Sequence, residues 1–108
     1  MDTQLKKGVL EMCVLAVLKQ RDCYGYELVN QISKKVSVSE GTIYPLLRRL
    51  KTEDYVEAYL QESNGGPSRK YYCLTERGQQ AGDKLLKEWE SFNQNIDQLL
   101  KGLTNGKN

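Results

Sequence analysis

Apolar residues recur at helical intervals over the first twenty residues of the chain. Their spacing places them on one face of a helix that spans residues 4–20. Further apolar residues widen this stripe, so we expect the helix to be buried on more than one side. The stripe consists of Leu5, Val9, Met12, Cys13, Ala16 and Val17, and it is widened by Leu10, Val14, Leu15 and Leu18.

A shorter apolar pattern predicts a second helix over residues 24–35. Leu28 and Ile32 lie one turn apart as its core pair, and Tyr24 lies one turn earlier. Gly25 in the first turn lowers helix propensity. We expect a compensating reason for this glycine, such as the close approach of another helix or of a phosphate.

A third pattern predicts a helix that runs to about Glu53. Ser37 and Glu40 have the spacing of a capping box ahead of the apolar run. Pro45 lies inside this helix and would crowd the carbonyl of Gly41, so we expect a bend or a loosened first turn rather than a helix end. The predicted buried face consists of Ile43, Leu46, Leu47 and Leu50.

Two short strands follow this helix. Residues 56–61 alternate between apolar and polar, as a half-buried strand does, and residues 69–74 form the return strand. Asn64 and Gly65 between them are a strong signal for a hairpin turn. Tyr71 and Tyr72 are adjacent on the return strand, so we expect one to face the core and the other to face outward.

The last third of the chain predicts one long helix that begins after a capping residue, Thr75. Its apolar residues are spaced alternately by four and three positions, which is a heptad seam. This seam is too long to be covered by the preceding helices alone, so we interpret it as a dimerisation helix. The seam consists of Leu85, Trp89, Phe92, Ile96, Leu99 and Leu103.

These elements predict a mainly α-helical fold with a small β-hairpin. In order, they indicate a winged helix-turn-helix over residues 1–74, a dimerisation helix over residues 75–103 and a disordered tail over residues 104–108. At 108 residues the chain is one domain with an ordinary content of apolar residues.

The composition argues against most enzyme and metal chemistry. The chain has no histidine, which removes the common catalytic dyads and histidine-metal sites. Cys13, Cys23 and Cys73 are widely spaced and form no CxxC pair, so we expect reduced cysteines and no metal or cofactor. The longest apolar run is far too short to span a membrane, and the N-terminus lacks a signal-peptide pattern. We therefore expect a cytoplasmic protein that is not an enzyme.

Charge is distributed unevenly along the chain, although the formal net charge is only +2. Residues 34–51 contain five basic residues and one acidic residue, whereas residues 75–100 contain three basic and five acidic residues. The basic segment coincides with the third predicted helix, where a helix-turn-helix would meet DNA.

The third predicted helix carries candidate DNA-binding residues on the side away from its apolar face. Ser39, Thr42 and Tyr44 offer hydroxyl groups to base edges or phosphates, and Arg48 and Arg49 suit phosphate contacts. On its own, this pattern also fits an ordinary solvated helix face.

The predicted hairpin adds a second basic element. Arg69 and Lys70 stand beside the glycine-containing tip, with no acidic residue between Asn64 and Thr75. Such a loop can follow a nucleic-acid backbone, and its cations can displace condensed counterions. The helix, the hairpin and the seam occur in the order of a winged-helix DNA-binding protein. Together they indicate such a protein more strongly than the helix or the hairpin does alone.

Three motifs resemble the PadR family of bacterial transcriptional regulators. They are residues 24–28 (YGYEL), residues 39–50 (SEGTIYPLLRRL) and residues 69–78 (RKYYCLTERG). The single C-terminal helix resembles the short subfamily, which includes a multidrug-sensing regulator. The resemblance implies a winged-helix homodimer that represses nearby genes, with some members responding to phenolic acids or drugs.

Trp89 raises the question of a small-molecule ligand. In a two-fold dimer it could lie near its mate and sandwich a flat aromatic compound, or it could simply pack in the interface. The resemblance implies a central pore lined by Leu5, Leu85, Leu86 and Trp89. Leu86 stands where the multidrug sensor has an aromatic residue and Asn93 where it has an acid, so a cationic drug would be held less well.

We therefore expect a homodimeric, sequence-specific repressor that binds an inverted repeat in double-stranded DNA. A planar aromatic ligand between the subunits would relieve repression. The alternatives are a winged-helix module that binds proteins and a DNA-binding dimer without an effector. The expected dimer interface consists of Leu85, Trp89, Phe92, Ile96 and Leu99.

Overall fold

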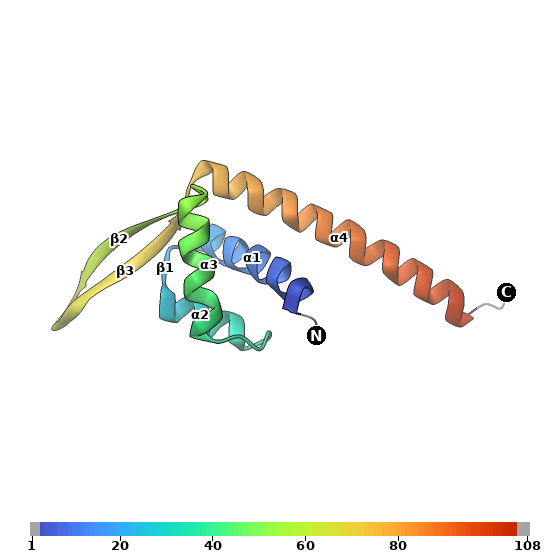
Figure 1. The fold of residues 1–108 in the computed structure, drawn as a ribbon, viewed down its shortest axis with the longest axis horizontal. Coiled ribbons are helices and arrows are strands. Elements are labelled where there is room, and N and C mark those ends of the chain that lie inside the picture. Colours follow the sequence, from blue (N-terminus) through green and yellow to red (C-terminus); the bar gives the residue numbers. More distant parts are fainter. Residues whose placement is uncertain (1–2, 106–108) are drawn as a thin grey trace.

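The computed structural model describes the backbone of residues 3–105, and the side chains of residues 3–7, 63 and 105 lie outside the description. Within residues 3–105, the chain forms four helices and three strands (Figure 1). The predominance of helix, with a small sheet and a long final helix, confirms the predicted fold class. The elements are α1 (Thr3–Gln20), β1 (Cys23–Tyr24), α2 (Gly25–Ser33), α3 (Glu40–Thr52), β2 (Val56–Ser63), β3 (Gly66–Leu74) and α4 (Glu76–Asn105).

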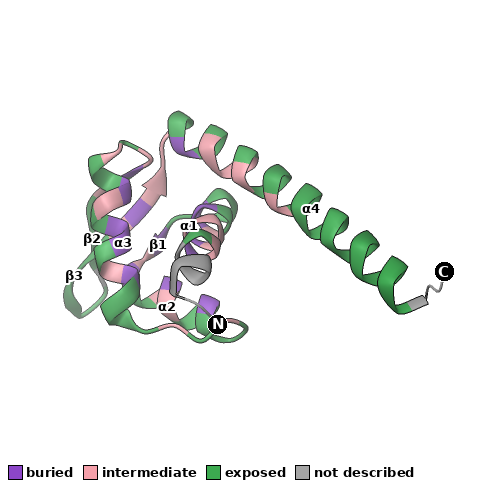
Figure 2. Ribbon diagram, turned by 45° about the vertical axis from the view of Figure 1, so that its right-hand side comes forward, coloured by how far each residue is buried: buried purple, intermediate pink, exposed green. Residues whose placement is uncertain are grey.

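The core lies where the first three helices meet the base of the sheet (Figure 2). Each predicted apolar face of α2 and α3 is buried, as expected for amphipathic helices. α1 is buried on more than one side, as predicted, and the residues that widen the stripe form its most buried part. Of the described residues of the stripe, Val9, Met12, Cys13 and Val17 are half-buried and Ala16 is exposed. The buried residues of α1 are Leu10, Val14, Leu15 and Leu18.

The sheet is antiparallel with the strand order β1-β3-β2. β1 was not predicted, because two residues directly before a helix are too few to show an alternating pattern. Tyr72 is buried and Tyr71, next to it, is only partly covered on the other face, which confirms the expected opposition of the two rings. Paired residues across β2 and β3 extend from Val56 opposite Leu74 towards the turn.

α3 begins at Glu40 with Ser39 as its N-cap, so the predicted capping box from Ser37 is wrong. The backbone N–H groups of Thr42 and Ile43 each donate to the Ser39 carbonyl at 3.1 Å, and the Ser39 side chain makes no capping bond. The helix continues through Pro45 to Thr52, as expected from the glycine at position 41.

α4 is anchored to the turn that follows α3. Thr75 caps the helix as predicted, because its hydroxyl oxygen accepts from the Gly78 N–H at 2.9 Å. The same hydroxyl donates to the Asp54 carbonyl at 2.7 Å, and the Thr75 N–H donates to the Tyr55 carbonyl at 3.1 Å. Asp54 itself has a φ of 64°, the left-handed conformation that turns the chain from α3 into β2.

Beyond this anchor, α4 extends away from the rest of the molecule (Figure 1). An ion pair of 2.8 Å between Lys19 and Asp83 ties α1 to the first turns of α4. Every described residue of α4 from Ser91 onward is exposed. The helix includes Thr104 and Asn105, two residues that were predicted to belong to the tail. Within residues 3–105, no helix is long and apolar enough to cross a membrane.

Candidate nucleic-acid interface

α3 separates its residues into an apolar inner face and a polar outer face. Ser39 at the N-cap, Thr42 in the first turn and Arg48 two turns further are all exposed. The inner face, in contrast, lies entirely in the core. The structure thus brings three of the predicted DNA-binding residues to an open helix face.

Tyr44 lies between α3 and α2 rather than on the open face. Its ring fills the space above Gly25, where an added Cβ would lie 2.3 Å from the Tyr44 Cε1 atom. Of the two reasons expected for Gly25, the structure shows the close approach of another helix, through the Tyr44 side chain of α3. Burial raises the pKa of the Tyr44 hydroxyl, and the nearby Glu40 carboxylate adds to this rise. Tyr44 therefore fixes the angle between the two helices of the helix-turn-helix.

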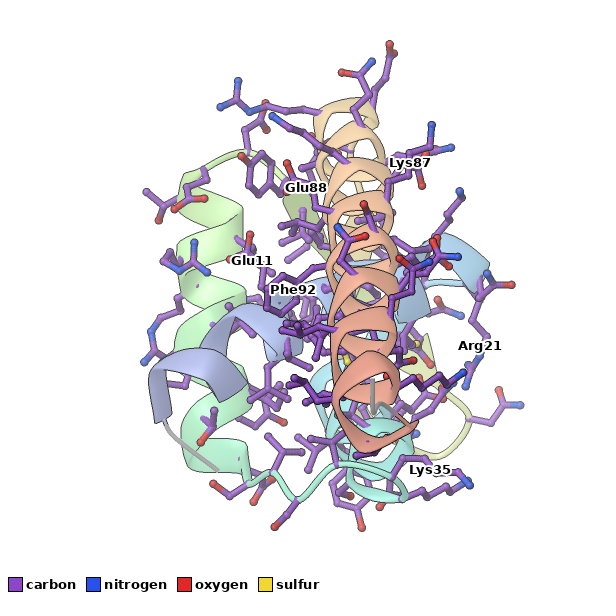
Figure 3. The ribbon with its side chains drawn as sticks, turned by 90° about the vertical axis from the view of Figure 1, so that its right-hand side faces the viewer. Glu11, Arg21, Lys35, Lys87, Glu88 and Phe92 are labelled. Atoms are coloured by element: carbon purple, nitrogen blue, oxygen red, sulfur yellow. The ribbon has the colours of Figure 1, made fainter. Side chains whose placement is uncertain are left out.

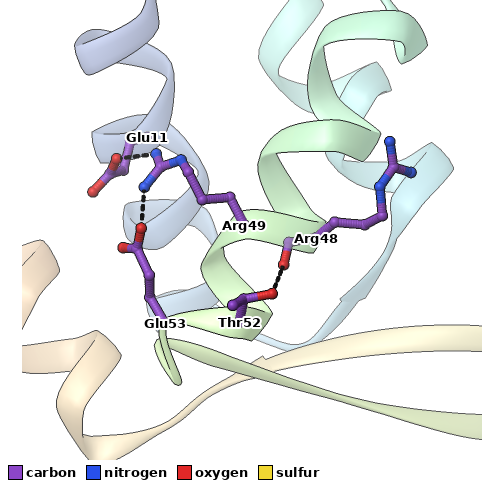
Figure 4. Close-up of polar contacts among 5 residues, drawn as sticks. All are labelled: Glu11, Arg48, Arg49, Thr52 and Glu53. Carbon is purple, nitrogen blue, oxygen red and sulfur yellow. Dashed lines mark hydrogen bonds and ion pairs between the residues drawn. The ribbon is translucent and has the colours of Figure 1, made fainter.

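Arg48 and Arg49 point in different directions from α3 (Figure 4). The Arg49 guanidinium is paired with Glu11 of α1 and with Glu53, the latter at 2.9 Å. These hydrogen bonds, above all the one with Glu11, raise the pKa of Arg49. Arg48 has no such partner among the described residues and is exposed. We therefore leave Arg49 out of the proposed DNA surface and keep Arg48 in it.

The two cations of the hairpin lie on opposite faces of the sheet. Lys70 shares a face with Tyr72, and its Nζ atom lies 5.9 Å from the centre of that ring. Arg69 lies on the other face, where its guanidinium carbon is 4.8 Å from the centre of the Tyr24 ring. Strand alternation produces this division, and the sequence prediction had grouped the two residues together.

Arg48 and Lys70 come together around Tyr72. Burial raises the pKa of the Tyr72 hydroxyl, and the positive charge of Arg48 opposes this rise. Lys70 contacts the same ring from the hairpin. The outer face of α3 and this face of the hairpin therefore each present an exposed cation, Arg48 and Lys70.

An open depression lies along α2. Arg21 and Lys35, which are labelled in Figure 3, line this depression, and Arg21 is paired with Glu27 at 3.4 Å. Its sides are too open to enclose a ligand, but they extend the basic character of the domain towards the end of α2. The depression is lined by Arg21, Glu27, Asn30, Gln31, Lys34 and Lys35.

The predicted seam on α4 divides into two parts. Leu85 packs against the core of its own chain, and Trp89 is half-buried. The distal residues are exposed to different degrees: Ile96 is 36% exposed, Phe92 57% and Leu103 70%. Of the predicted ligand residues, Leu86 is also exposed, and Leu5 lies outside the described side chains.

The described part of the chain contains no candidate metal site and no activated cysteine. No group of three potential ligands lies together among the residues that the structure describes. Desolvation by burial raises the pKa of Cys13, Cys23 and Cys73, so each thiol stays protonated and weakly nucleophilic at neutral pH.

Comparison with known proteins decides the family. Residues 14–84 match the Transcriptional regulator PadR-like family. The chain belongs to this family. A PadR-like transcriptional regulator from Bacillus cereus strain ATCC 14579 is 40% identical, with a TM-score of 0.85 over 93% of this chain and 99% of that one. A PadR family transcription regulator from Clostridium difficile R20291 is 31% identical, with a TM-score of 0.78 over 84% of this chain and 97% of that one.

The PadR-like assignment makes the molecule a DNA-binding transcription regulator with a winged-helix fold, and not an enzyme. Transcriptional regulator YqjI of Escherichia coli is 30% identical over 93 residues, which are 82% of this chain but only 43% of that protein. In terms of the winged-helix fold, α2 and α3 correspond to the helix-turn-helix, and the hairpin of β2 and β3 corresponds to the wing.

Proposed function

We propose that this chain is a homodimeric, sequence-specific transcriptional repressor whose α3 enters the major groove of DNA. The outer face of α3 supports this proposal most directly, because Ser39, Thr42 and Arg48 are exposed there opposite a fully buried apolar face. Short hydroxyl side chains can reach base edges, and an arginine can contact guanine or phosphate.

The same face argues against a module that binds proteins. Such a module would present large apolar residues on the open side of the helix, since these dominate protein–protein contacts. The exposed residues of α3 are Glu40, Gly41, Thr42, Pro45, Arg48, Lys51 and Thr52. Because hydroxyls and cations prevail among them, a nucleic acid suits this surface better than a protein does.

Selection from a pool of random DNA duplexes tests the proposal. The chain should enrich an inverted repeat whose half-sites lie about one helical turn, or roughly 10 base pairs, apart. Retention of DNA without enrichment of any sequence would contradict sequence-specific binding. The enriched duplex, called the selected duplex below, then serves for affinity measurements.

Variants of the wing test which face of the hairpin meets DNA. We expect Lys70→Ala to weaken binding to all duplexes and to reduce the slope of log affinity against log salt by about 1, because one phosphate contact is lost. Arg69→Ala removes the same charge from the opposite face and should change the slope less. Equal slopes for Lys70→Ala and the wild-type chain would exclude Lys70 from the interface.

A second proposed activity is the binding of a planar aromatic effector between the subunits. Trp89 is half-buried, beside exposed Leu86 and Phe92, so an indole face can remain accessible near the proposed dimer axis. Titration with planar aromatic compounds should then quench the fluorescence of Trp89, which is the only tryptophan, in a saturable way. Unchanged fluorescence would favour a closed seam and a repressor without an effector.

A further inference from the structure

Three tyrosines stand side by side across the outer face of the sheet. Tyr24 of β1 and Tyr59 of β2 both pair with Tyr71 of β3, which lies between them. The Tyr59 and Tyr71 rings are stacked at 5.7 Å, and the Tyr24 and Tyr71 rings meet edge to face at 5.5 Å. We call Tyr24, Tyr71 and Tyr59 the tyrosine ladder.

Both ends of the tyrosine ladder are tied to the body of the domain. The Tyr59 hydroxyl donates to the Asp22 Oδ2 atom at 2.7 Å, so the side chain of the outermost strand reaches across β3 to the residue before β1. At the other end, Tyr24 is the N-cap of α2, and its backbone N–H donates to the Glu27 carboxylate at 3.1 Å. The Arg69 guanidinium covers the Tyr24 ring and adds a third link to the hairpin.

These links bear on the orientation of the hairpin because they lie at its base, while its distal half is exposed. Described residues from Tyr59 to Lys70 are exposed, and the hairpin projects beyond the helices (Figure 1). On the inner side, only its base is held, by buried Val56 and Tyr72. A two-stranded hairpin alone is marginally stable in water, so a contact on the outer side of the base controls the angle at which it leaves the domain.

We propose that the tyrosine ladder and Asp22 are positioning residues that hold the wing at the angle where Lys70 and Arg48 meet the same DNA duplex. This inference rests on the proposed DNA-binding function. The ladder lies on the face opposite Lys70, so it acts through the orientation of the strands and not through contact with DNA. Its hydrogen bond also persists over the physiological range, because the Asp22 carboxylate raises the pKa of Tyr59 to about 12 and the hydroxyl stays protonated.

Tyr59→Phe tests the proposal with the smallest change, since it removes the hydroxyl and keeps the ring. We expect affinity for the selected duplex to fall about threefold to tenfold, because a hydrogen bond to a charged group is lost and the wing samples other angles. The salt slope should remain that of the wild-type chain, because no cation is removed. Hydrogen exchange of the free protein should become faster in residues 56–74.

Asp22→Ala separates positioning from direct contact. Removing a carboxylate near DNA would strengthen binding if only charge mattered, whereas loss of the Tyr59 bond should weaken it. The double variant should have the same affinity as the weaker-binding single variant, since both substitutions remove the same hydrogen bond. Tyr71→Phe is the matched control, because it removes a hydroxyl from the same ladder and leaves the Asp22 bond in place.

The outcomes distinguish this inference from the function on which it rests. If the wild-type chain selects no sequence, the proposed function fails. If it selects a duplex but Tyr59→Phe and Asp22→Ala both bind and exchange as the wild-type chain does, the positioning role of the ladder is overturned and the proposed function stands.

Discussion

Arg48 and Arg49 are neighbours in the chain, yet their side chains leave α3 in different directions (Figure 4). We expect Arg48→Ala to weaken DNA binding and to reduce its salt slope by about 1, with no change in thermal stability, because this side chain is exposed. Arg49→Ala should instead lower the free energy of unfolding by about 0.5–1 kcal/mol, since it breaks two partly exposed ion pairs. Paired salt titrations and urea unfolding curves measure both effects, and a reversal of the two would refute this division of roles.

The division between the two arginines could not be read from the sequence. Two adjacent arginines near the end of a basic helix are equivalent in the sequence. They differ in the structure because Arg49 is paired with Glu11, a residue on another helix. The same limit applies to Arg69 and Lys70, which strand alternation places on opposite faces once the register is known. Residue types were therefore predictable at this site, whereas their partners required the tertiary structure.

At the scale of elements, the start of α4 depends on a glycine. An added Cβ at Gly78 would lie 1.9 Å from the Tyr55 carbonyl oxygen, a backbone atom that cannot move without displacing the turn after α3. We expect Gly78→Ala to lower the free energy of unfolding by about 2 kcal/mol, because the overlap outweighs the gain in helix propensity. Urea unfolding at fixed protein concentration measures this change.

Gly102→Ala is the control for that experiment, because nothing described lies within 4 Å of a Cβ at this position of the same helix. It should leave stability unchanged or raise it by up to about 1 kcal/mol. An equal loss of stability in both variants would contradict the role of the Tyr55 contact and would indicate a general intolerance of α4 to substitution.

Most elements followed from periodicity, and the failures have physical causes. α2, α3 and α4 each have one apolar side, so their inner faces were predictable. Residues 9–18 of α1 are apolar except for Glu11, and a periodic pattern cannot then decide which side is buried most deeply. β1 is too short to have a pattern, and it is recognisable only by its pairing with β3. The tyrosine ladder was missed for that reason, since Tyr24 joins it through β1.

At the scale of the whole molecule, the distal part of α4 presents an apolar stripe that a single chain leaves in water. Phe92 is 57% exposed, Ile96 36% and Leu99 57%. A stripe of this length is costly to hydrate and marks an interface. A second copy of the chain is the partner we propose, because the heptad spacing allows the same surface to pack against itself around a two-fold axis.

We therefore expect Phe92→Glu and Ile96→Glu to convert the protein into a monomer in sedimentation equilibrium. These positions are preferable to Leu85, which packs on the core of its own chain, so that a charge there would also destabilise the fold. Gln94→Glu adds the same charge to the opposite side of α4 and should leave the dimer intact. Because a dimer occupies both half-sites at once, each monomeric variant should also lose most of its affinity for the selected duplex. A variant that remains dimeric with a carboxylate at either position would place the subunit interface elsewhere and would remove α4 as the element that sets the spacing of the two α3 helices.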